Sequence, residues 1–377
     1  MTHEGLALYI HWPFCVSKCP YCDFNSHVRS SIDQDEWREA LLADLAHEAK
    51  VLPDRRLTSI FFGGGTPSLM DPATVAALID AAREHWPADD AIEIALEANP
   101  GSVEAARFAD LAAAGVNRLS LGLQSFDDQA LRFLGRAHSA IEGLAALDIA
   151  QDNFQRVSFD LIYALPDDTE KSWRANLDRA LSLGTTHLSL YELTIEPGTR
   201  FASMVARRDF EPLDSDIAAT LYEMTDAVTS AAGLPAYEIS NHARPGAESR
   251  HNLTYWRYGD YAGVGPGAHG RRLGARTVRH RKPENFLAGL RRNGHAISEE
   301  EALTPREAAD EALVMGLRLS EGIDIGAIEQ RFGVPVADRQ RIARLVESGH
   351  LASSGERVKP TAAGRLLLDR ILAEIAA

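Results

Sequence analysis

The chain has 377 residues, of which 45% are hydrophobic and 25% charged, a profile typical of a globular protein with room for two domains. Its formal net charge of -15 disfavours general nucleic-acid binding, because phosphate contacts need clustered Lys and Arg. The sequence shows neither a signal-peptide pattern nor an apolar run long enough to span a membrane. We therefore expect a cytoplasmic protein.

Short β-rich runs alternate with helical stretches in the first half of the chain, which predicts βα units around a parallel sheet. The expected strands cover residues 6–11, 58–62, 92–97, 118–122, 157–162 and 187–193. Between the first two, apolar residues recur every four positions from Trp37 to Ala49, which predicts an amphipathic helix. Six such strands predict an α/β fold, a partial (β/α)6 barrel whose functional groups gather at the carboxyl ends of its strands.

The character of the chain changes near residue 302. Helices are expected after Thr304 and over 323–332, 338–348 and 361–376, with a hairpin over 349–360. This order predicts a winged-helix-like domain over 301–377, while the barrel occupies 1–300. Residues 302–377 carry ten Lys or Arg against eleven Asp or Glu, which favours packing against the barrel over DNA binding.

All three cysteines, Cys15, Cys19 and Cys22, follow directly on the first expected strand. An odd number so closely spaced cannot form a disulfide framework. Three thiolates on one loop could instead hold an iron–sulfur cluster that leaves one iron open for a small molecule. The alternatives are a zinc site completed by His11 or His27, and buried cysteines that bind nothing.

The spacing CxxxCxxC, with an aromatic residue before the last cysteine, resembles the radical S-adenosylmethionine (SAM) superfamily. The segments YIHWPFC, FFGGGTPS, LEANP and LGLQSF, at the first four expected strands, resemble one subgroup in the same order. That subgroup comprises the oxygen-independent coproporphyrinogen III oxidases and the HemW heme chaperones. The resemblance covers nearly the whole chain and implies a partial barrel of the radical SAM type.

By this resemblance the three cysteines hold a 4Fe-4S cluster, and Tyr9 and Tyr21 lie beside the cluster and SAM. The other SAM contacts that it implies come from Gly64, Gly65, Thr66, Glu97, Gln124, Arg136 and Asp160. Glycines let a backbone approach a ligand closely, carboxylates accept hydrogen bonds from hydroxyl or ammonium groups, and Arg recognises a carboxylate. Taken singly, each residue could equally belong to a turn, a surface or a salt bridge.

Two features favour the heme chaperones over the oxidases. The oxidases carry a longer N-terminal segment and a fourth cysteine two residues after the third, whereas here Asp23 and Phe24 follow Cys22. The run HNLTYW at 251–256 matches the HNxxYW signature of the chaperones. Histidine is a common heme ligand and aromatic rings pack on porphyrins, so we expect a heme site. Its residues would be His251, Tyr255 and Trp256; the alternative is a surface histidine beside core aromatics.

A basic cluster, residues 271–282, holds six Lys or Arg in twelve positions. It suggests a local anion partner, either heme propionates or an anionic membrane surface, and the alternative is a solvated face. The expected function is that of a heme chaperone which passes heme to an acceptor protein and forms a homodimer. SAM cleavage would need an electron donor such as a flavodoxin or ferredoxin. An anaerobic porphyrinogen oxidase and a winged-helix regulator with a redox-sensing cluster stay open as alternatives.

Overall fold

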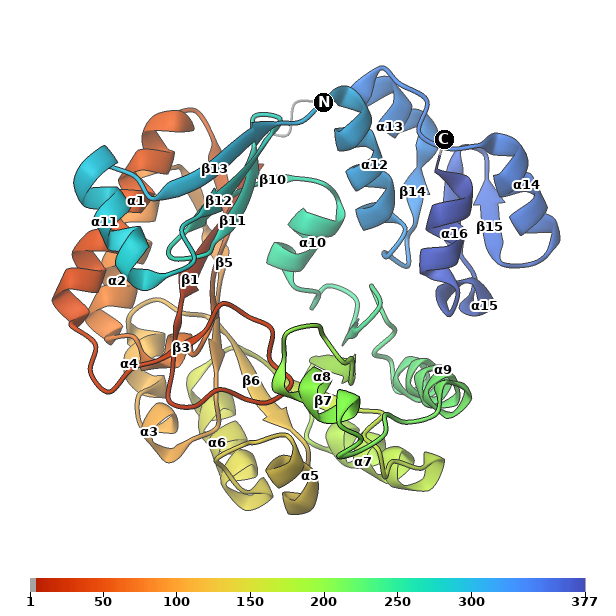
Figure 1. Cartoon of the computed structure of the whole chain (residues 1–377), viewed down its shortest axis with the longest axis horizontal. Helices are drawn as coiled ribbons and strands as arrows, with labels where there is room; N and C mark the ends of the chain where they lie inside the picture. Colours follow the sequence, from red (N-terminus) through yellow and green to blue (C-terminus); the bar gives the residue numbers. More distant parts are fainter. Residues whose placement is uncertain (1–4, 377) are drawn as a thin grey trace.

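The structure, a computed structural model, describes residues 5–376 and contains within them one sheet of 11 strands, in the order β13-β12-β11-β10-β1-β4-β5-β6-β7-β8-β9 (Figure 1). The strands predicted for the first half are all present and parallel to one another. They are β1 (Gly5–Trp12), β4 (Arg56–Gly64), β5 (Ala88–Ala98), β6 (Arg118–Gln124), β7 (Arg156–Tyr163) and β8 (His187–Glu192). The sheet ends at the unpaired edges of β13 and β9, so the predicted α/β class and incomplete barrel are confirmed.

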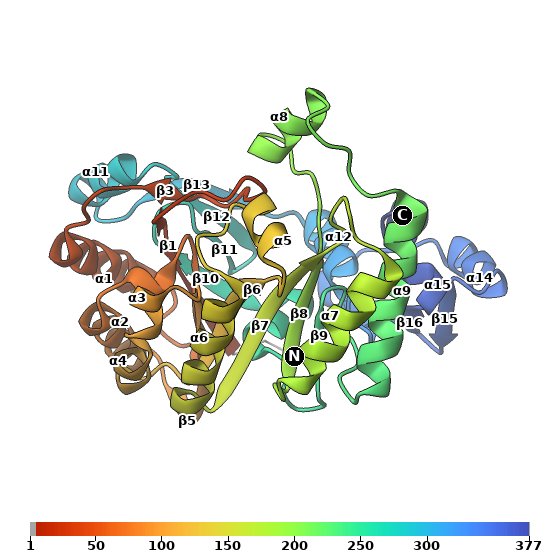
Figure 2. The same cartoon turned by 90° about the horizontal axis from the view of Figure 1, so that it is seen from below.

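The longer helices cover the outer side of these strands (Figure 2), whereas the short η1 and α3 line the carboxyl ends of the strands. These helices are α1 (Gln34–Val51), η1 (Pro67–Leu69), α2 (Pro72–His85), α3 (Ser102–Ala105), α4 (Phe108–Ala113), α5 (Asp128–Phe133), α6 (Ala140–Asn153) and α7 (Glu170–Ser182). In α1, the Asp33 side chain accepts a hydrogen bond from the backbone N–H of Glu36 at 3.1 Å and so caps the helix. The predicted apolar face from Trp37 to Ala49 is buried in the main core. Each leucine buried there contributes roughly 1.5–3 kcal/mol to stability.

The second half of the chain extends the sheet at both edges, which the sequence did not indicate. Strand β10 (Asp260–Val264) adds parallel to β1, and β9 (Asn241–Ala243) adds antiparallel to β8. An antiparallel series follows β10: β11 (His269–Arg272), β12 (Ala275–Arg279) and β13 (Ile297–Ala302). These strands are short and rich in Arg or Glu, so they lack the apolar alternation by which strands are usually found. The helices of this half are α8 (Arg200–Ala206), α9 (Ser215–Ala231), α10 (Arg250–Trp256) and α11 (Pro283–Asn293).

Half of the six basic side chains at 271–282 are buried, namely Arg271, Arg272 and Arg279, and the prediction of an anion site is wrong for Arg272 and Arg279. Arg272 and Arg279 are 2% and 0% exposed. Both pair with the buried carboxylate of Glu48, at 2.7 and 2.6 Å, and Arg279 also pairs with Asp44 at 3.3 Å. These ion pairs join β11 and β12 to α1, so the two guanidinium groups are already neutralised and cannot serve a membrane surface or heme propionates.

Beyond the large sheet, the predicted order of helices and hairpin is confirmed. The elements are α12 (Pro305–Gly316), β14 (Ile323–Asp324), α13 (Ile325–Phe332), α14 (Arg339–Glu347), β15 (Leu351–Ser354), β16 (Arg357–Pro360), α15 (Ala362–Arg365) and α16 (Leu368–Ile375). The helix expected over 361–376 is thus two helices, interrupted at residues 366–367.

The buried residues of this region form a second hydrophobic core, separate from that of the barrel. The predicted domain boundary between residues 300 and 301 stays a prediction, which the separate cores support. Residues 1–4 and 377, at the outer ends of the two predicted domains, lie outside the described residues. No helix within residues 5–376 has the length and apolar character needed to cross a membrane.

Candidate functional site

A cavity of about 600 Å³ opens at the carboxyl ends of the parallel strands. Its walls come from the loop after β1 and from the ends of β4 to β8, which are far apart in the sequence but adjacent in the sheet. All the residues predicted to hold the cluster and SAM, except Tyr9, line this cavity: Cys15, Cys19, Tyr21, Cys22, Gly64, Gly65, Thr66, Glu97, Gln124, Arg136 and Asp160. The structure therefore brings the predicted set together.

The cysteine loop is closed at its base by two short parallel strands, β2 (Phe14–Cys15) and β3 (His27–Val28). Within it, the backbone N–H of Cys22 donates to the carbonyl of Cys19 at 3.2 Å. All three thiols are free and partly exposed. Burial raises the pKa of Cys15 and Cys22, which favours the protonated thiols over the thiolates.

Polar groups converge on two of the thiols. The Thr66 hydroxyl donates to Cys15 Sγ at 3.4 Å, and Arg136 donates to Cys19 Sγ at 3.5 Å. Asn99 bridges these two donors, since its amide N–H donates to Thr66 Oγ1 at 3.0 Å and its carbonyl oxygen accepts from Arg136. The buried Arg136 Nε has no hydrogen-bond partner among residues 5–376. A cation with a spare donor beside these thiols fits a ligand that carries a carboxylate.

Glycines are required at the end of β4, because the backbone there passes very close to His11 and Phe14. Gly64 has φ 113°, and a Cβ there would lie 2.5 Å from the His11 ring. A Cβ on Gly65 would lie 2.7 Å from the carbonyl oxygen of Phe14. A side chain would therefore push the Gly-rich segment away from β1 at Gly64 and away from the base of the cysteine loop at Gly65.

Two carboxylates form the floor of the cavity. Burial, reinforced by the charge of Asp160, raises the pKa of Glu97 to about 8. Burial also raises the pKa of Asp160 to about 6, although hydrogen bonds from Ser189 and Ser120 oppose it. The backbone N–H of Gly64 donates to Glu97 at 3.1 Å. Two acids with raised pKa values attract a cationic ligand, because its charge favours their ionised forms.

Gln124 ends β6 in a backbone conformation that is rare for a residue with a side chain. Its φ is 68°, which costs roughly 1 kcal/mol or more outside glycine. The side-chain amide turns back over Gly122, where an added Cβ would lie 2.7 Å from Gln124 Nε2. Arg136 donates to the carbonyl of Gly122 at 3.0 Å. Gln124 and Arg136 thus converge on the same stretch of the cavity wall.

The HNxxYW run forms α10, which lies between the sheet and α12 (Figure 1). His251 is 1% exposed, so the alternative of a surface histidine is wrong. Its Nδ1 is hydrogen-bonded to Ser59 Oγ at 2.9 Å and its Nε2 to the Tyr255 hydroxyl at 2.7 Å. The ring stacks on Phe61 with centroids 4.9 Å apart. Burial lowers the pKa of His251 to about 3, which keeps the imidazole neutral.

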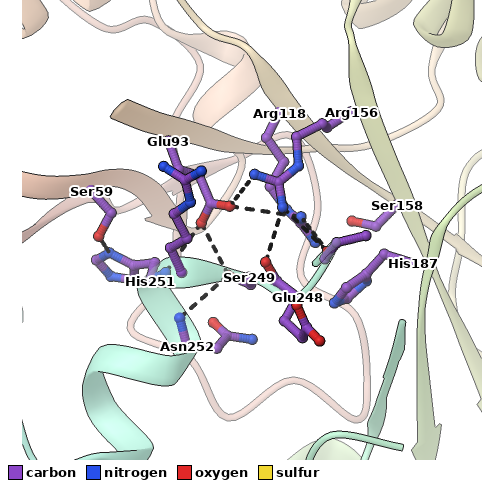
Figure 3. A network of polar contacts seen from close by, with 12 residues as sticks. Ser59, Glu93, Arg118, Arg156, Ser158, His187, Glu248, Ser249, His251 and Asn252 are labelled. Carbon is purple, nitrogen blue, oxygen red and sulfur yellow. Dashed lines mark hydrogen bonds and ion pairs between the residues drawn. The ribbon is translucent and has the colours of Figure 1, made fainter. Parts of the chain in front are cut away.

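A buried ion-pair network holds the start of α10 (Figure 3). The Glu93 carboxylate accepts from the His251 backbone N–H at 3.1 Å and from the Ser249 hydroxyl at 3.4 Å. Arg156 and Arg118 lie 2.8 and 3.8 Å from the same carboxylate. Both arginines also donate to the carbonyl of residue 247. Strands β5, β6 and β7 thereby fix the segment that carries His251.

The third motif residue, Trp256, is directed elsewhere. It is partly buried, and the Arg318 guanidinium lies 5.8 Å from its ring centroid. His251 and Tyr255 thus lie together, whereas Trp256 contacts the C-terminal region. Neither His251 nor Tyr255 lines the cysteine cavity.

Comparison with known proteins identifies the family to which this chain belongs. A family model described as the radical SAM superfamily matches residues 9–180, and one described as the HemN C-terminal domain matches residues 303–367. The chain is 42% identical to heme chaperone HemW of Escherichia coli, over 75% of this chain and 76% of that protein. It is 35% identical to heme chaperone HemW of Haemophilus influenzae, over 97% of both chains. The chain belongs to the HemW family.

Two further relatives bear on this membership. The bovine (Bos taurus) radical S-adenosyl methionine domain-containing protein 1, mitochondrial, is 43% identical over 85% of this chain and 74% of that protein. The solved structure of coproporphyrinogen III oxidase (HemN) from Escherichia coli, a radical SAM enzyme, has a TM-score of 0.83. It covers 98% of this chain and 89% of that one at 24% identity, so it shows the shared fold alone.

In this HemW-family chain Tyr9 does not reach the cavity. Its hydroxyl is hydrogen-bonded to His11 Nδ1 at 2.9 Å, and its ring stacks on Phe61 at 6.2 Å between centroids. The His251 ring is 6.4 Å away. Tyr9 therefore lies between the cavity and α10, and its contact with SAM stays a prediction.

The two histidines of the zinc alternative, His11 and His27, make hydrogen bonds to other residues. His11 Nε2 is hydrogen-bonded to the carbonyl of Asn25 at 2.9 Å, so both ring nitrogens of His11 have partners. His27 contacts the Asn25 side chain. Among residues 5–376, no group of three His, Cys, Asp or Glu side chains could hold a metal ion directly.

Sequence reasoning missed three residues that hold the side chains of these two regions in place. Asn99 lies within the LEANP segment, but its amide gave no separate signal. Glu93 did carry one, since an acidic residue within a strand of buried apolar residues needs a buried partner. Ser59, as an isolated serine in a strand, had no distinguishing pattern.

Proposed function

We propose that this protein is a heme chaperone that holds a 4Fe-4S cluster and SAM in the cysteine cavity, binds heme at α10 and passes it to an acceptor protein. The observation that carries this proposal is the 35% identity with heme chaperone HemW of Haemophilus influenzae over 97% of both chains. The HNxxYW helix supports it, because His251 and Tyr255 lie together on α10.

The donor set in the cavity fits the cluster and SAM. Cys15, Cys19 and Cys22 would hold three irons, and Arg136 would receive the SAM carboxylate. Glu97 and Asp160 would accept hydrogen bonds from its ammonium and ribose hydroxyl groups. When bound, this pair of cofactors supplies one-electron chemistry. The chain's own residues orient SAM and carry the compensating charges.

The alternative function, oxidation of coproporphyrinogen III, has the fold in its favour but not the cysteines. Asp23 and Phe24 follow Cys22, where the oxidases carry a further cysteine by resemblance. An anaerobic assay with coproporphyrinogen III, SAM and a reduced electron donor separates the two functions. We expect no turnover, and turnover would favour the oxidase.

Heme binding is tested by hemin titration of the parent, the His251→Ala variant and the His242→Ala variant, each prepared without oxygen. His242 is a matched control because it is also buried, with Nδ1 hydrogen-bonded to Thr229 at 2.8 Å. We expect the parent and His242→Ala to show the same shifted heme absorption, and His251→Ala to lose it. Absence of binding by the parent would contradict the heme proposal.

A further inference from the structure

The His251 ring is held from both sides. Ser59 Oγ lies 2.9 Å from Nδ1 and the Tyr255 hydroxyl lies 2.7 Å from Nε2. Iron binds an imidazole through a nitrogen lone pair, and both nitrogens are already hydrogen-bonded here. Heme ligation by His251 therefore requires that one of these two hydrogen bonds be given up.

The Nδ1 side is the fixed one. Ser59 is 0% exposed in the middle of β4, between two parallel neighbours. The His251 backbone is tied to Glu93, which pairs with Arg156 at 2.8 Å (Figure 3). Moving Nδ1 away from Ser59 would leave a buried ring nitrogen and a buried hydroxyl without partners. If the start of α10 moved with the ring, the Glu93 contacts that hold its backbone would break as well.

The Nε2 side is the adjustable one. Tyr255 lies in the last turn of the seven-residue helix α10, four residues after His251. It is partly exposed, and its ring meets Tyr261 edge to face with centroids 4.4 Å apart. A rotation of this side chain would uncover Nε2 without disturbing Glu93 or the start of the helix.

We propose that Tyr255 is a displaceable cap on the heme ligand: its hydroxyl occupies Nε2 of His251 in the heme-free protein, and heme iron replaces it. This inference rests on the proposed heme site. In the tautomer that it requires, Nδ1–H donates to Ser59 Oγ and the Tyr255 hydroxyl donates to Nε2. The Tyr255 hydrogen bond breaks and the iron–Nε2 bond forms with the same lone pair, so no proton leaves the imidazole.

The surroundings suit a neutral nitrogen ligand. The low pKa of His251, caused by burial, keeps the lone pair available at physiological pH. Ser59 acts as a positioning residue, because an acceptor at Nδ1 fixes the tautomer and raises the basicity of Nε2. Tyr255 and Ser59 thus have opposite effects on ligation although both contact the same ring.

The test is anaerobic hemin titration of the parent and the Tyr255→Phe, Ser59→Ala and Tyr222→Phe variants. Removing the cap should tighten hemin binding about fivefold, since one competing hydrogen bond is lost. Ser59→Ala should weaken binding about tenfold. Tyr222→Phe, a tyrosine substitution on α9 away from His251, should change nothing.

Melting temperatures and absorption spectra distinguish the loss of the cap from a general structural effect of the substitution. Without hemin, Tyr255→Phe leaves Nε2 unpaired in a buried place, so its melting temperature should fall by about 1–3 °C. With hemin, its absorption spectrum should keep the features assigned to His251. Weaker or unchanged hemin binding by Tyr255→Phe, in a parent that binds through His251, would overturn the cap alone. A parent that binds no hemin would overturn the proposed heme site as well.

Discussion

The two functional regions of this barrel differ in how completely their polar groups are satisfied. At the cysteine cavity, three thiols are free, Arg136 Nε lacks a partner among the described residues, and two acids have raised pKa values. At α10, both nitrogens of His251 are hydrogen-bonded and Glu93 has two arginines. If the proposed function holds, the first region would receive its ligands directly, whereas the second would have to release an internal contact first.

The largest expected effect is at the cavity. Replacing Cys19 with Ala removes one of three cluster ligands, so iron retained after anaerobic reconstitution should fall from about four per chain to near zero. Iron and sulfide analysis measures this directly. Ser17→Ala, on the same loop, is the matched control and should retain the parent's iron. A Cys19→Ala protein with full iron would show that the cluster is held elsewhere.

The second largest effect is expected from the Glu93 ion pairs, which hold the start of α10. Glu93→Ala leaves Arg118 and Arg156 without their buried carboxylate, so the free energy of unfolding should fall by about 3–5 kcal/mol. Denaturant unfolding measures it, with the exposed Glu39→Ala as a control that should change stability by less than about 0.5 kcal/mol. A loss of under about 1 kcal/mol for Glu93→Ala would show that the network does not hold the helix.

A pH dependence follows from Glu97, whose pKa is raised to about 8. Its proton is held more tightly in the folded chain than in the unfolded one, so the ligand-free fold loses stability as pH rises from about 4.5 towards 8. SAM is cationic and favours the ionised carboxylate. Its affinity should therefore rise about tenfold between pH 6.5 and 8.

Anaerobic calorimetric titration of reconstituted protein with SAM measures this affinity. Glu97→Gln cannot ionise and serves as the matched variant, so its affinity should be lower and nearly independent of pH. A pH-independent affinity in the parent would show that Glu97 does not face the cation.

The smallest effect concerns Asn99. Its amide joins Thr66 to Arg136, so Asn99→Ala should misplace the guanidinium and weaken SAM binding about five- to tenfold. The iron content should stay at the parent's level, because no cluster ligand is touched. Loss of iron in Asn99→Ala would instead assign the residue to the cluster loop.

Local patterns predicted much of the fold. The parallel strands and α1 follow from apolar periodicity, which depends on neighbours in sequence. The basic cluster shows that local patterns do not predict contacts between residues far apart in the sequence. Glu48, the partner of Arg272, lies 224 residues earlier in the chain, so nothing near the arginines in the sequence reveals that they are buried and paired.

The sequence predicted the residues of the cysteine cavity more completely than the surroundings of His251. The cysteine spacing and the ordered segments led to residues that the fold gathers around one cavity. The HNxxYW motif identified a helix, but not that its histidine is enclosed by Ser59 and Tyr255. The burial of His251 depends on strands β4 and β5, which precede the motif by well over a hundred residues.

Hemin titration of two variants tests most directly whether one barrel carries two separate ligand sites. In the first, Cys15, Cys19 and Cys22 are all replaced with Ala; in the second, His251 is replaced with Ala. We expect the cysteine variant to bind hemin with the parent's absorption spectrum, and the His251 variant to keep its iron–sulfur cluster but lose that spectrum. Loss of hemin binding in the cysteine variant together with parent-like binding in the His251 variant would contradict the account.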